Sequence, residues 1–569
     1  MDPQQPPTNP RVWMRELVFS DGSQVALNLD DIVVLVGPNN SGKSVALKNI
    51  EEKAKDRAFP AAVVSSMKMS ISGDKTQLCA WLERNCRKNI STPSNPIYSR
   101  LGVSVHESNA KVYWDNFANG LRELSRFFVY LLTTDSRLNA ANPAQNIALT
   151  KDPLTHPIHY LQVNDTVEKK VSSFFKDAFG EDLIVHRNAG NHVPLHCGVR
   201  PIPQKGEDRV SLSYIREIEK LPTLHTQGDG MRSFVGVLLH SLVVDHSIIL
   251  IDEPEAFLHP PQAHLLGQMI VKEAPQDRQF FLATHSGDFL RGLLDTYTER
   301  VRILRIQRDG TVNKIKELDS AGIKQIWGDP ILRYSNVLDG VFHNKVILCE
   351  SDGDCRFYAA IMDAIIYPKS EDRREHIMFL HCGGKARMPV VISSLRNLDV
   401  PVHVIADFDI LNNESPLKEI VEALGGSWEV IEANWRVVQR AIEEKKPELN
   451  TAEVVRDIDS ILQTISNSFF PKEAKKGIQE ILRRSSPWSI AKTVGKAFIP
   501  SGDPTRAYNA VCEELERIGL FVVPLGELEG FARSIGGHGP KWVNEVLERD
   551  LANDPELEDA RAFVRNILT

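Results

Sequence analysis

The chain has 569 residues, of which 42% are hydrophobic and 25% charged, and its formal net charge is −8. This composition is typical of a globular protein with two to four domains, and it excludes a fibrous or disordered chain. The negative balance also excludes a globally basic nucleic-acid binder, so any basic binding surface would have to be local.

Cysteine usage and hydropathy bear on the cellular compartment. The seven cysteines form no CxxC pair, which argues against a zinc site and predicts reduced thiols in a cytoplasmic protein. No apolar run is long enough to cross a membrane, and the polar, Pro-rich start MDPQQPPTNP lacks the regions of a signal peptide. We therefore expect no membrane partner.

Residues 30–55 predict a buried strand, a glycine-rich loop and a helix, and the loop reads GPNNSGKS. In such a loop the glycines let backbone N–H groups face phosphate, and the lysine reaches the β- and γ-phosphates. The serine hydroxyl then suits Mg²⁺. The sequence thus predicts an ATP and Mg²⁺ site whose first residues are Gly37, Asn39, Asn40, Gly42, Lys43 and Ser44.

Two later strands add polar groups to this site. The apolar run SIILIDEP ends in Asp252 and Glu253, at the strand end where ligands bind in open α/β sheets. We expect Asp252 to hold the Mg²⁺ shell and Glu253 to polarise the attacking water. A third predicted strand, RQFFLATHS, ends in His285.

These features resemble an ABC-type ATPase, whose switch histidine contacts the γ-phosphate as His285 would. The turn at 224–230, LHTQGDG, resembles a divergent ABC signature with Thr226 and Gly228 at the Ser and Gly positions. In that family the signature of one protomer completes the ATP site of another, so the resemblance implies a homodimer or larger homo-oligomer. The long stretch between the phosphate loop and the acidic strand predicts an insertion at about 65–210.

The carboxyl-terminal half repeats a strand–turn–helix pattern. Glu350 ends one predicted strand and Asp354 begins the next helix, a Gly-Gly-Lys turn follows the second strand, and Asp407 and Asp409 end the third. Residues two apart on a strand point to the same side, so both aspartates would face one ion together with Glu350. Carboxylate oxygens of this kind suit Mg²⁺ or Mn²⁺.

A later strand, LFVVPLGELEGF, ends in Glu527 and Glu529, and Lys541 follows. Two-metal nucleases need acids for both ions and often a cation near the scissile phosphate. We therefore assign both glutamates to a second metal and Lys541 to catalysis. A solvated acidic turn beside a surface lysine is the competing explanation.

The ordered acids and the GGK turn resemble a Toprim domain, although Ser351 stands where many such domains have Gly. An ABC-type ATPase joined to a Toprim domain resembles the OLD (overcoming lysogenization defect) nuclease family. The resemblance implies an α/β chain with an ATPase domain at 1–330. It places a Toprim, Rossmann-like nuclease domain at 340–569, with a helical insertion at about 415–518.

For function, the resemblance implies an ATP-regulated, metal-dependent DNA endonuclease or nickase in antiphage defence. Its implied partners are DNA and a retron reverse transcriptase with its DNA, or a UvrD-like helicase. The expected catalytic residues are Glu253, His285, Glu350, Asp407, Asp409 and Lys541, and the expected metal ligands are Ser44, Asp252, Glu350, Asp354, Asp407, Asp409, Glu527 and Glu529. A RecF- or SMC-like DNA-binding ATPase that does not cleave, and an RNA or tRNA nuclease, remain alternatives.

Overall fold

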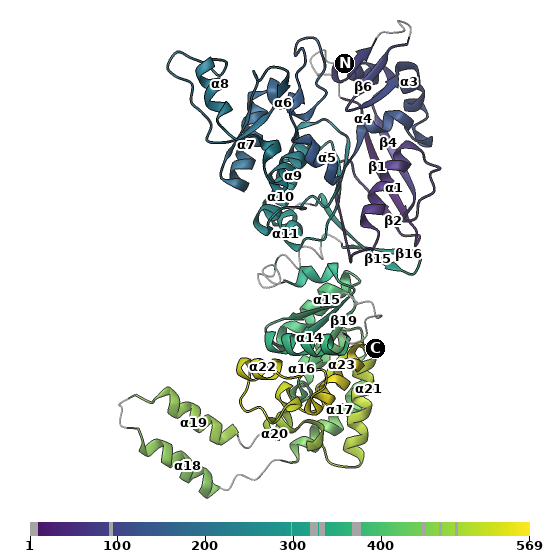
Figure 1. Cartoon of the computed structure of the whole chain (residues 1–569). Coiled ribbons are helices and arrows are strands. Elements are labelled where there is room, and N and C mark those ends of the chain that lie inside the picture. The colour runs from purple at the N-terminus through teal and green to yellow at the C-terminus, as the bar shows by residue number, and fades with distance from the viewer. Residues whose placement is uncertain are drawn as a thin grey trace. The chain divides into compact units, whose positions relative to one another are not determined.

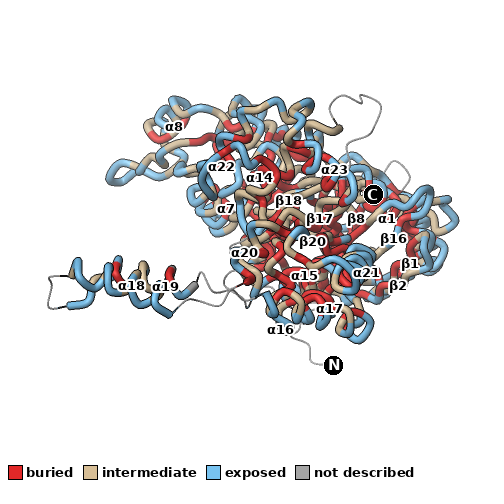
Figure 2. The backbone as a smooth tube through the Cα atoms, turned by 90° about the horizontal axis from the view of Figure 1, so that it is seen from below, coloured by how far each residue is buried: buried red, intermediate tan, exposed pale blue. Residues whose placement is uncertain are grey.

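The computed structural model describes residues 9–89, 95–296, 299–318, 328, 336–366, 377–445, 451–465, 469–483 and 487–568. The chain forms two compact units, residues 1–334 and 335–569 (Figure 1). Each unit has its own central sheet, and buried residues concentrate on the strands of both (Figure 2). No helix among the described residues is long and apolar enough to cross a membrane.

Unit 1 is built on a six-stranded sheet in the order β16-β15-β3-β14-β13-β8. All neighbouring strands are parallel except β16, which is antiparallel to β15. Strands β3 and β14 are buried along their whole length, as parallel strands covered on both faces must be. The strands are β3 (Ile32–Val36), β8 (Val129–Leu132), β13 (Ile248–Asp252), β14 (Gln279–Ala283), β15 (Val301–Asp309) and β16 (Val312–Leu318).

Small antiparallel sheets surround this core. One has the order β2-β1-β4, another the order β5-β6-β7, and two are strand pairs, β10-β12 and β11-β9. Their strands are β1 (Arg11–Phe19), β2 (Gln24–Ala26), β4 (Val64–Ser72), β5 (Arg87–Asn89), β6 (Ile97–Arg100), β7 (Val103–His106), β9 (Ala144–Gln145), β10 (Asp182–Val185), β11 (His192–Val193) and β12 (Leu195–Gly198).

The helices of unit 1 lie between and around these sheets (Figure 1). They are α1 (Lys43–Lys55), α2 (Lys75–Asn85), α3 (Glu107–Asp115), α4 (Ser125–Phe128), α5 (Thr134–Ala140), α6 (Pro157–Val163), α7 (Asp165–Phe179), α8 (Leu212–Glu219), α9 (Asp229–Leu238), α10 (Pro260–Glu273) and α11 (Gly287–Asp295). The stretch expected as an insertion at about 65–210 is not separate from the core. Strand β8 lies within it and pairs with β13, and β4 pairs with β1.

Unit 2 is built on a four-stranded parallel sheet in the order β18-β17-β19-β20. Its strands are β17 (Lys345–Cys349), β18 (Ile377–His381), β19 (Val402–Ala406) and β20 (Leu520–Val522). All four run the same way, so their carboxyl ends meet at one edge. Glu350 and Asp407 directly follow strands at that edge, which is where the sequence places the acids.

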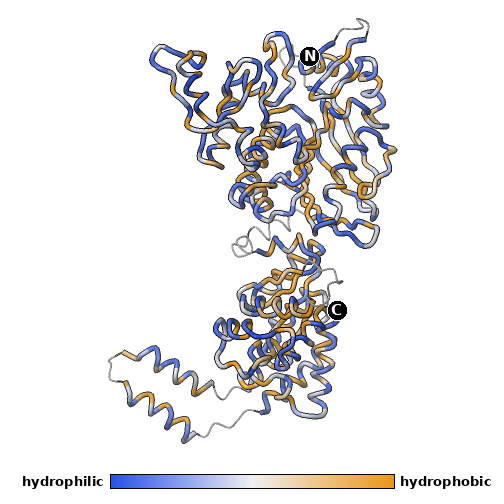
Figure 3. Tube along the Cα trace, viewed as in Figure 1, coloured by the Kyte–Doolittle hydropathy of each residue, from blue (hydrophilic) through white to orange (hydrophobic). Residues whose placement is uncertain are grey.

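The helices of unit 2 include α14 (Asp352–Ile366), α15 (Met388–Asn397), α16 (Glu414–Ala423), α17 (Trp428–Glu443), α18 (Thr451–Gln463), α19 (Lys472–Arg483), α20 (Pro487–Val494), α21 (Asp503–Arg517), α22 (Pro540–Leu547) and α23 (Glu558–Leu568). Helices α16 to α21 fall between β19 and β20. Along α18 and α19 hydrophobic and hydrophilic segments alternate (Figure 3). These two helices pack on each other, as amphipathic helices do.

Candidate functional site

The phosphate loop of unit 1 connects β3 to α1 and depends on two glycines. Gly37 has φ +143°, and a Cβ there would lie 2.1 Å from the Ile306 carbonyl oxygen. Gly42 has φ +103° and precedes the first residue of α1. The Lys43 Nζ donates hydrogen bonds to the carbonyl oxygens of Gly37 and Pro38, at 2.8 and 2.9 Å. The loop is therefore curled around its own lysine.

Strand order explains why residues from three separate motifs meet at this loop. Strand β14 lies between β3 and β13, so the residues after all three strands share one edge. The Ser44 Oγ donates a hydrogen bond of 2.8 Å to Asp252. Burial raises the pKa of Asp252, and burial also lowers the pKa of Lys43 against the opposing charge of Glu253. A bound Mg²⁺ and phosphate would satisfy both groups.

Glu253 and His285 face each other at the same edge. The His285 Nδ1 lies 3.2 Å from a Glu253 carboxylate oxygen, and both side chains are about half exposed. Glu253 has φ +50°, a left-handed conformation that non-glycine residues adopt rarely. Behind them, the buried Glu255 accepts hydrogen bonds from the Thr284 hydroxyl and the His285 N–H, at 2.7 and 3.2 Å. This pairing orients the end of β14.

Arg137 belongs to this site but carries no sequence signal. It lies on α5, is fully buried, and donates to the backbone carbonyl oxygens of Asp252 and Glu253, at 2.9 and 2.5 Å. Arg137 is a single arginine on a helix that matches no motif, so the sequence does not mark it as a site residue. Its contacts hold the backbone that carries both acids.

The other residues predicted to bind ATP are exposed. Asn39 and Asn40 are exposed on the loop, and Asn40 has φ +62°. Thr226 and Gly228 are exposed just before α9, and the Thr226 hydroxyl donates to the Thr223 carbonyl oxygen at 2.8 Å. Within the described ranges, no recorded hydrogen bond joins Thr226 or Gly228 to the phosphate loop.

In unit 2 the acids after β17 and β19 converge. Carboxylate oxygens of Glu350, Asp407 and Asp409 lie within 4.8 Å of one another and form a group able to hold a metal ion. The Asp407 N–H also donates to Glu350 at 3.4 Å. Burial raises the pKa of Glu350 to about 7 and that of Asp407 to about 6, so both acids sit where a divalent cation would stabilise their charged forms.

The convergence of the two aspartates has a different origin from the one expected. Strand β19 ends at Ala406, and Asp407 and Asp409 lie at the start of a 3₁₀ helix, η7 (Phe408–Asn412). The alternation of a strand therefore does not bring them to one side. The turn of η7 does so instead, because a tight helical turn follows the strand at once.

Two lysines balance the charge of these acids. The Nζ of Lys385, from the GGK turn, pairs with Asp409 and lies 3.5 Å from Glu350. The Nζ of Lys492, from α20, lies 3.0 Å from Asp407 and 3.6 Å from Asp409. Neither lysine was assigned to the site. The GGK turn was a usable signal for Lys385, whereas Lys492 sits in the helical stretch that carries no signature.

Close backbone packing brings α20 to the acids. A Cβ on Gly526, which has φ +105°, would lie 2.0 Å from the Lys492 carbonyl oxygen. A Cβ on Gly495 would lie 2.2 Å from the Pro524 carbonyl oxygen. The Phe408 N–H donates to the Gly526 carbonyl oxygen at 2.7 Å. The loop after β20 is thus locked between α20 and η7.

A second group of metal-ligating side chains lies on this loop. Glu527 and Glu529 join His538 with ligand atoms within 4.8 Å of one another, and burial raises the pKa of Glu527. Asp354 lies in the first turn of α14, where its carboxylate accepts from the Ser351 N–H at 2.9 Å and its own N–H donates to the Ser351 hydroxyl. Ser351 therefore caps α14, and Asp354 in its first turn completes a capping box.

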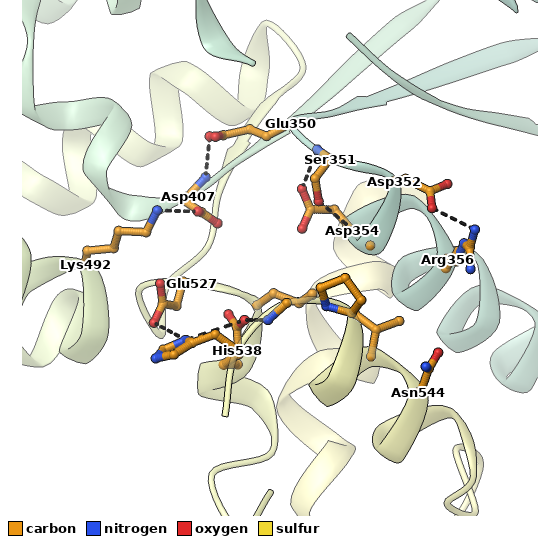
Figure 4. Close-up of a pocket in the computed structure, with 16 residues that line it drawn as sticks. Glu350, Ser351, Asp352, Asp354, Arg356, Asp407, Lys492, Glu527, His538 and Asn544 are labelled. Atoms are coloured by element: carbon orange, nitrogen blue, oxygen red, sulfur yellow. Dashed lines mark hydrogen bonds and ion pairs between the residues drawn. The ribbon is translucent and has the colours of Figure 1, made fainter. Parts of the chain in front are cut away.

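Both groups open into one pocket of about 510 Å³. Its lining includes Glu350, Asp354, Asp407, Lys492, Glu527, Glu529 and His538 (Figure 4). Lys541 is not among the lining residues: it is 78% exposed on α22 and lies 3.8 Å from Glu545. Lys492 is a cation of the pocket lining that faces the acids. Carboxylate oxygens from both groups fit hard divalent ions such as Mg²⁺ or Mn²⁺.

Fold and site together define a P-loop ATPase joined to a Toprim domain. Residues 102–291 match a family described as "AAA domain, putative AbiEii toxin, Type IV TA system". Residues 341–409 match the Toprim domain of overcoming lysogenization defect protein-like proteins. The chain thus joins an ATPase domain to an OLD-like Toprim domain, an arrangement consistent with the ATPase–Toprim fusions of the OLD family, and these two domains support ATPase and metal-dependent nuclease activity.

Two curated relatives cover parts of the chain. An OLD nuclease of Thermus scotoductus is 26% identical over 168 residues, which are 28% of this chain and 31% of that protein. The match thus spans less than a third of that nuclease's length. An uncharacterized protein of Methanocaldococcus jannaschii, MJECL11, is 31% identical over 97 residues, 16% of this chain and 84% of that protein.

Solved structures with a similar fold are heads of SMC proteins. The SMC head domain from Thermotoga maritima is 11% identical, covers 55% of this chain and 98% of its own, and has a TM-score of 0.28. The Smc head domain from Pyrococcus furiosus is 11% identical, covers 56% and 99%, and has a TM-score of 0.30. At this similarity, the assignment of fold rests on the strand order and on the two matched domain models.

Proposed function

We propose that the protein is an ATP-regulated, divalent-metal-dependent DNA endonuclease or nickase. The observation that carries this proposal is one pocket of unit 2, which Glu350 and Asp407 line together with Glu527 and Glu529. Two-metal phosphodiester hydrolysis needs ligands for two neighbouring ions, and this pocket offers two groups of such ligands.

The residues divide into two ion positions. Glu350, Asp407 and Asp409 would hold one ion, and Glu527 and Glu529 the other, with help from Asp354. Together such ions activate a water molecule and stabilise the leaving oxygen. The protein's own contribution is orientation and charge. Lys492, which lies 3.0 Å from Asp407, is placed to donate to a substrate phosphate once the acids are occupied.

The role we assign to ATP is regulation, because hydrolysis of a phosphodiester is already favourable. Lys43, Ser44 and Asp252 would hold the nucleotide and Mg²⁺, Glu253 would polarise the attacking water, and His285 would contact the γ-phosphate. Thr226 and Gly228 are exposed and would complete the site of a second copy. We thus infer a nucleotide-dependent homodimer or larger homo-oligomer.

The biological role we propose is antiphage defence in the cytoplasm. The match of residues 341–409 to the OLD-like Toprim model and the OLD nuclease relative support it. A retron reverse transcriptase with its DNA, or a UvrD-like helicase, is the kind of partner we propose. An RNA nuclease is the alternative that the test must separate, because RNA presents the same phosphodiester to the ions.

The test is cleavage by the purified full-length chain. Supercoiled plasmid and a structured RNA are each incubated with protein and Mg²⁺ or Mn²⁺, beside Asp407→Asn and the control Glu414→Gln, an exposed acid at the start of α16. We expect nicked or linear plasmid from the wild type and the control, and at least a hundredfold less from Asp407→Asn. Equal cleavage by Asp407→Asn would exclude this active site. Cleavage of RNA alone would favour the RNA-nuclease alternative, and no cleavage would favour the DNA-binding ATPase.

A further inference from the structure

His538 lies in a tight glycine-rich turn at the rim of the acidic pocket. Gly537 and Gly539 on either side of it have φ +96° and +67°, left-handed conformations that favour glycine. The Gly539 N–H donates a hydrogen bond of 2.9 Å to a Glu529 carboxylate oxygen. One acid of the pocket therefore fixes the backbone that presents His538.

Buried packing on the far side holds the same turn. Pro540 begins α22, where a proline suits the first helical turn. Trp542 on that helix is fully buried, and its indole N–H donates to the Ala532 carbonyl oxygen at 3.2 Å. The turn is thus anchored at both ends, while the imidazole of His538 is 77% exposed. An exposed side chain on a fixed backbone is free to meet a ligand.

The imidazole faces the two glutamates of the loop after β20. Its Nδ1 lies 3.8 Å from a Glu527 oxygen and 3.7 Å from a Glu529 oxygen, and Figure 4 shows the side chains of His538 and Glu527 directed toward one another. Ligand atoms at about 2.1 Å from a six-coordinate ion lie roughly 3 Å apart when adjacent and about 4.2 Å apart when opposite. The observed separations fall between these values.

The two ligand groups of the pocket differ in chemistry. Glu350, Asp407 and Asp409 offer oxygen only, whereas the second group offers two carboxylates and an imidazole nitrogen. Mg²⁺ strongly favours oxygen ligands and keeps much of its water. Mn²⁺ shares the preference of Mg²⁺ for carboxylate oxygen, but as a first-row transition ion it also accepts an imidazole nitrogen, a ligand that Mg²⁺ binds weakly.

We propose that His538 is a nitrogen ligand of the second ion position and makes that position select Mn²⁺ over Mg²⁺. The all-carboxylate position accepts either ion. This inference rests on the proposed two-ion pocket, but it does not depend on which nucleic acid is cut. It assigns His538 a role in metal selection that the glutamates cannot fill alone.

Spectroscopy of the Mn²⁺-loaded full-length protein tests the nitrogen bond directly. Electron spin echo envelope modulation reports ¹⁴N nuclei coordinated to Mn²⁺, and we expect that signal in the wild type. His538→Gln should abolish it, whereas the control His381→Gln, which changes the exposed histidine at the end of β18, should retain it. A wild type without ¹⁴N modulation, or modulation that survives in His538→Gln, would overturn the proposal.

Calorimetric titration with each metal alone tests selectivity. We expect His538→Gln to weaken the second Mn²⁺ site about tenfold and to leave Mg²⁺ binding within twofold, while Glu527→Gln/Glu529→Gln removes the second site for both ions. Equal losses for Mn²⁺ and Mg²⁺ in His538→Gln would contradict selection by nitrogen. Far-ultraviolet circular dichroism confirms folding of each variant.

The two proposals fail separately. A protein that shows ¹⁴N-coordinated Mn²⁺ but cuts no nucleic acid refutes the nuclease function and leaves the role of His538 intact. A protein that cuts plasmid but shows no His538-dependent ¹⁴N signal refutes the role of His538 alone.

Discussion

The nucleotide site of unit 1 and the acidic pocket of unit 2 balance their charges differently. In unit 1 the Lys43 ammonium is held by two carbonyl oxygens of its own loop, and Ser44 pairs with Asp252. In unit 2 the acids pair with two lysines, Lys385 from the GGK turn after β18 and Lys492 from α20. The first site is assembled from adjacent strand ends, whereas the second also depends on the helices inserted between β19 and β20.

Because the two sites are built separately, we expect that ATP hydrolysis and nucleic-acid cleavage can be lost one at a time. The largest loss of activity is expected at Glu253. Glu253→Gln removes the carboxylate that would polarise the attacking water and should lower ATP hydrolysis by about 10²–10³-fold. Nucleotide binding should persist, because Lys43 and Asp252 are untouched.

The measurement pairs steady-state ATPase assays with plasmid cleavage by the same variant in the absence of ATP. Cleavage without ATP should match the wild type, since no acid of unit 2 has changed. Loss of cleavage without ATP in Glu253→Gln would show that the two sites are not separable in this way.

The dependence of the acidic pocket on close packing can be broken at Gly526. Alanine there forces a Cβ to within 2.0 Å of the Lys492 carbonyl oxygen in a left-handed conformation. Strain and overpacking together should lower the free energy of unfolding by about 3 kcal/mol.

Gly502→Ala is the matched control for this variant. Gly502 has φ +98°, but a Cβ there would meet nothing within 4 Å. Only the backbone strain remains, about 1 kcal/mol. Urea denaturation of both variants measures the difference, and equal destabilisation would refute the importance of the contact between α20 and the loop after β20.

The variant Lys492→Met tests the role of Lys492, because it keeps an unbranched side chain and removes the charge. Cleavage should fall about 10–100-fold through loss of a cation near the phosphate. Divalent-ion binding should become tighter, because the lysine no longer competes for Asp407. Lys496→Met, an exposed residue in the turn after α20, should change neither quantity. Weaker metal binding in Lys492→Met would contradict the competition.

The same contrast explains what the sequence could and could not predict. The phosphate loop, the acidic strand end and the strand ending in His285 are short local patterns, and parallel pairing brings their ends to one edge. The acids of unit 2 were identifiable for the same reason. Arg137 and Lys492 were not, because each is a lone basic residue on a helix, and tertiary packing alone brings it to the site. Lys541 was selected for its position after two acids, yet its side chain points outside the pocket lining.

Asp354 offers the smallest and most discriminating comparison, because it belongs to the capping box of α14 and is also a candidate metal ligand. The amide oxygen of asparagine accepts a hydrogen bond as a carboxylate oxygen does, so Asp354→Asn should keep the hydrogen bond from the Ser351 N–H. We expect its free energy of unfolding to stay within about 0.5 kcal/mol of the wild type, whereas Asp354→Ala should lose about 1 kcal/mol with that hydrogen bond. If Asp354 also supports the second ion, both variants will weaken that ion to the same extent despite their different stabilities. Titration with Mn²⁺ beside thermal unfolding separates the two roles: unchanged Mn²⁺ affinity in Asp354→Asn would leave Asp354 with a structural role only, in the capping box of α14.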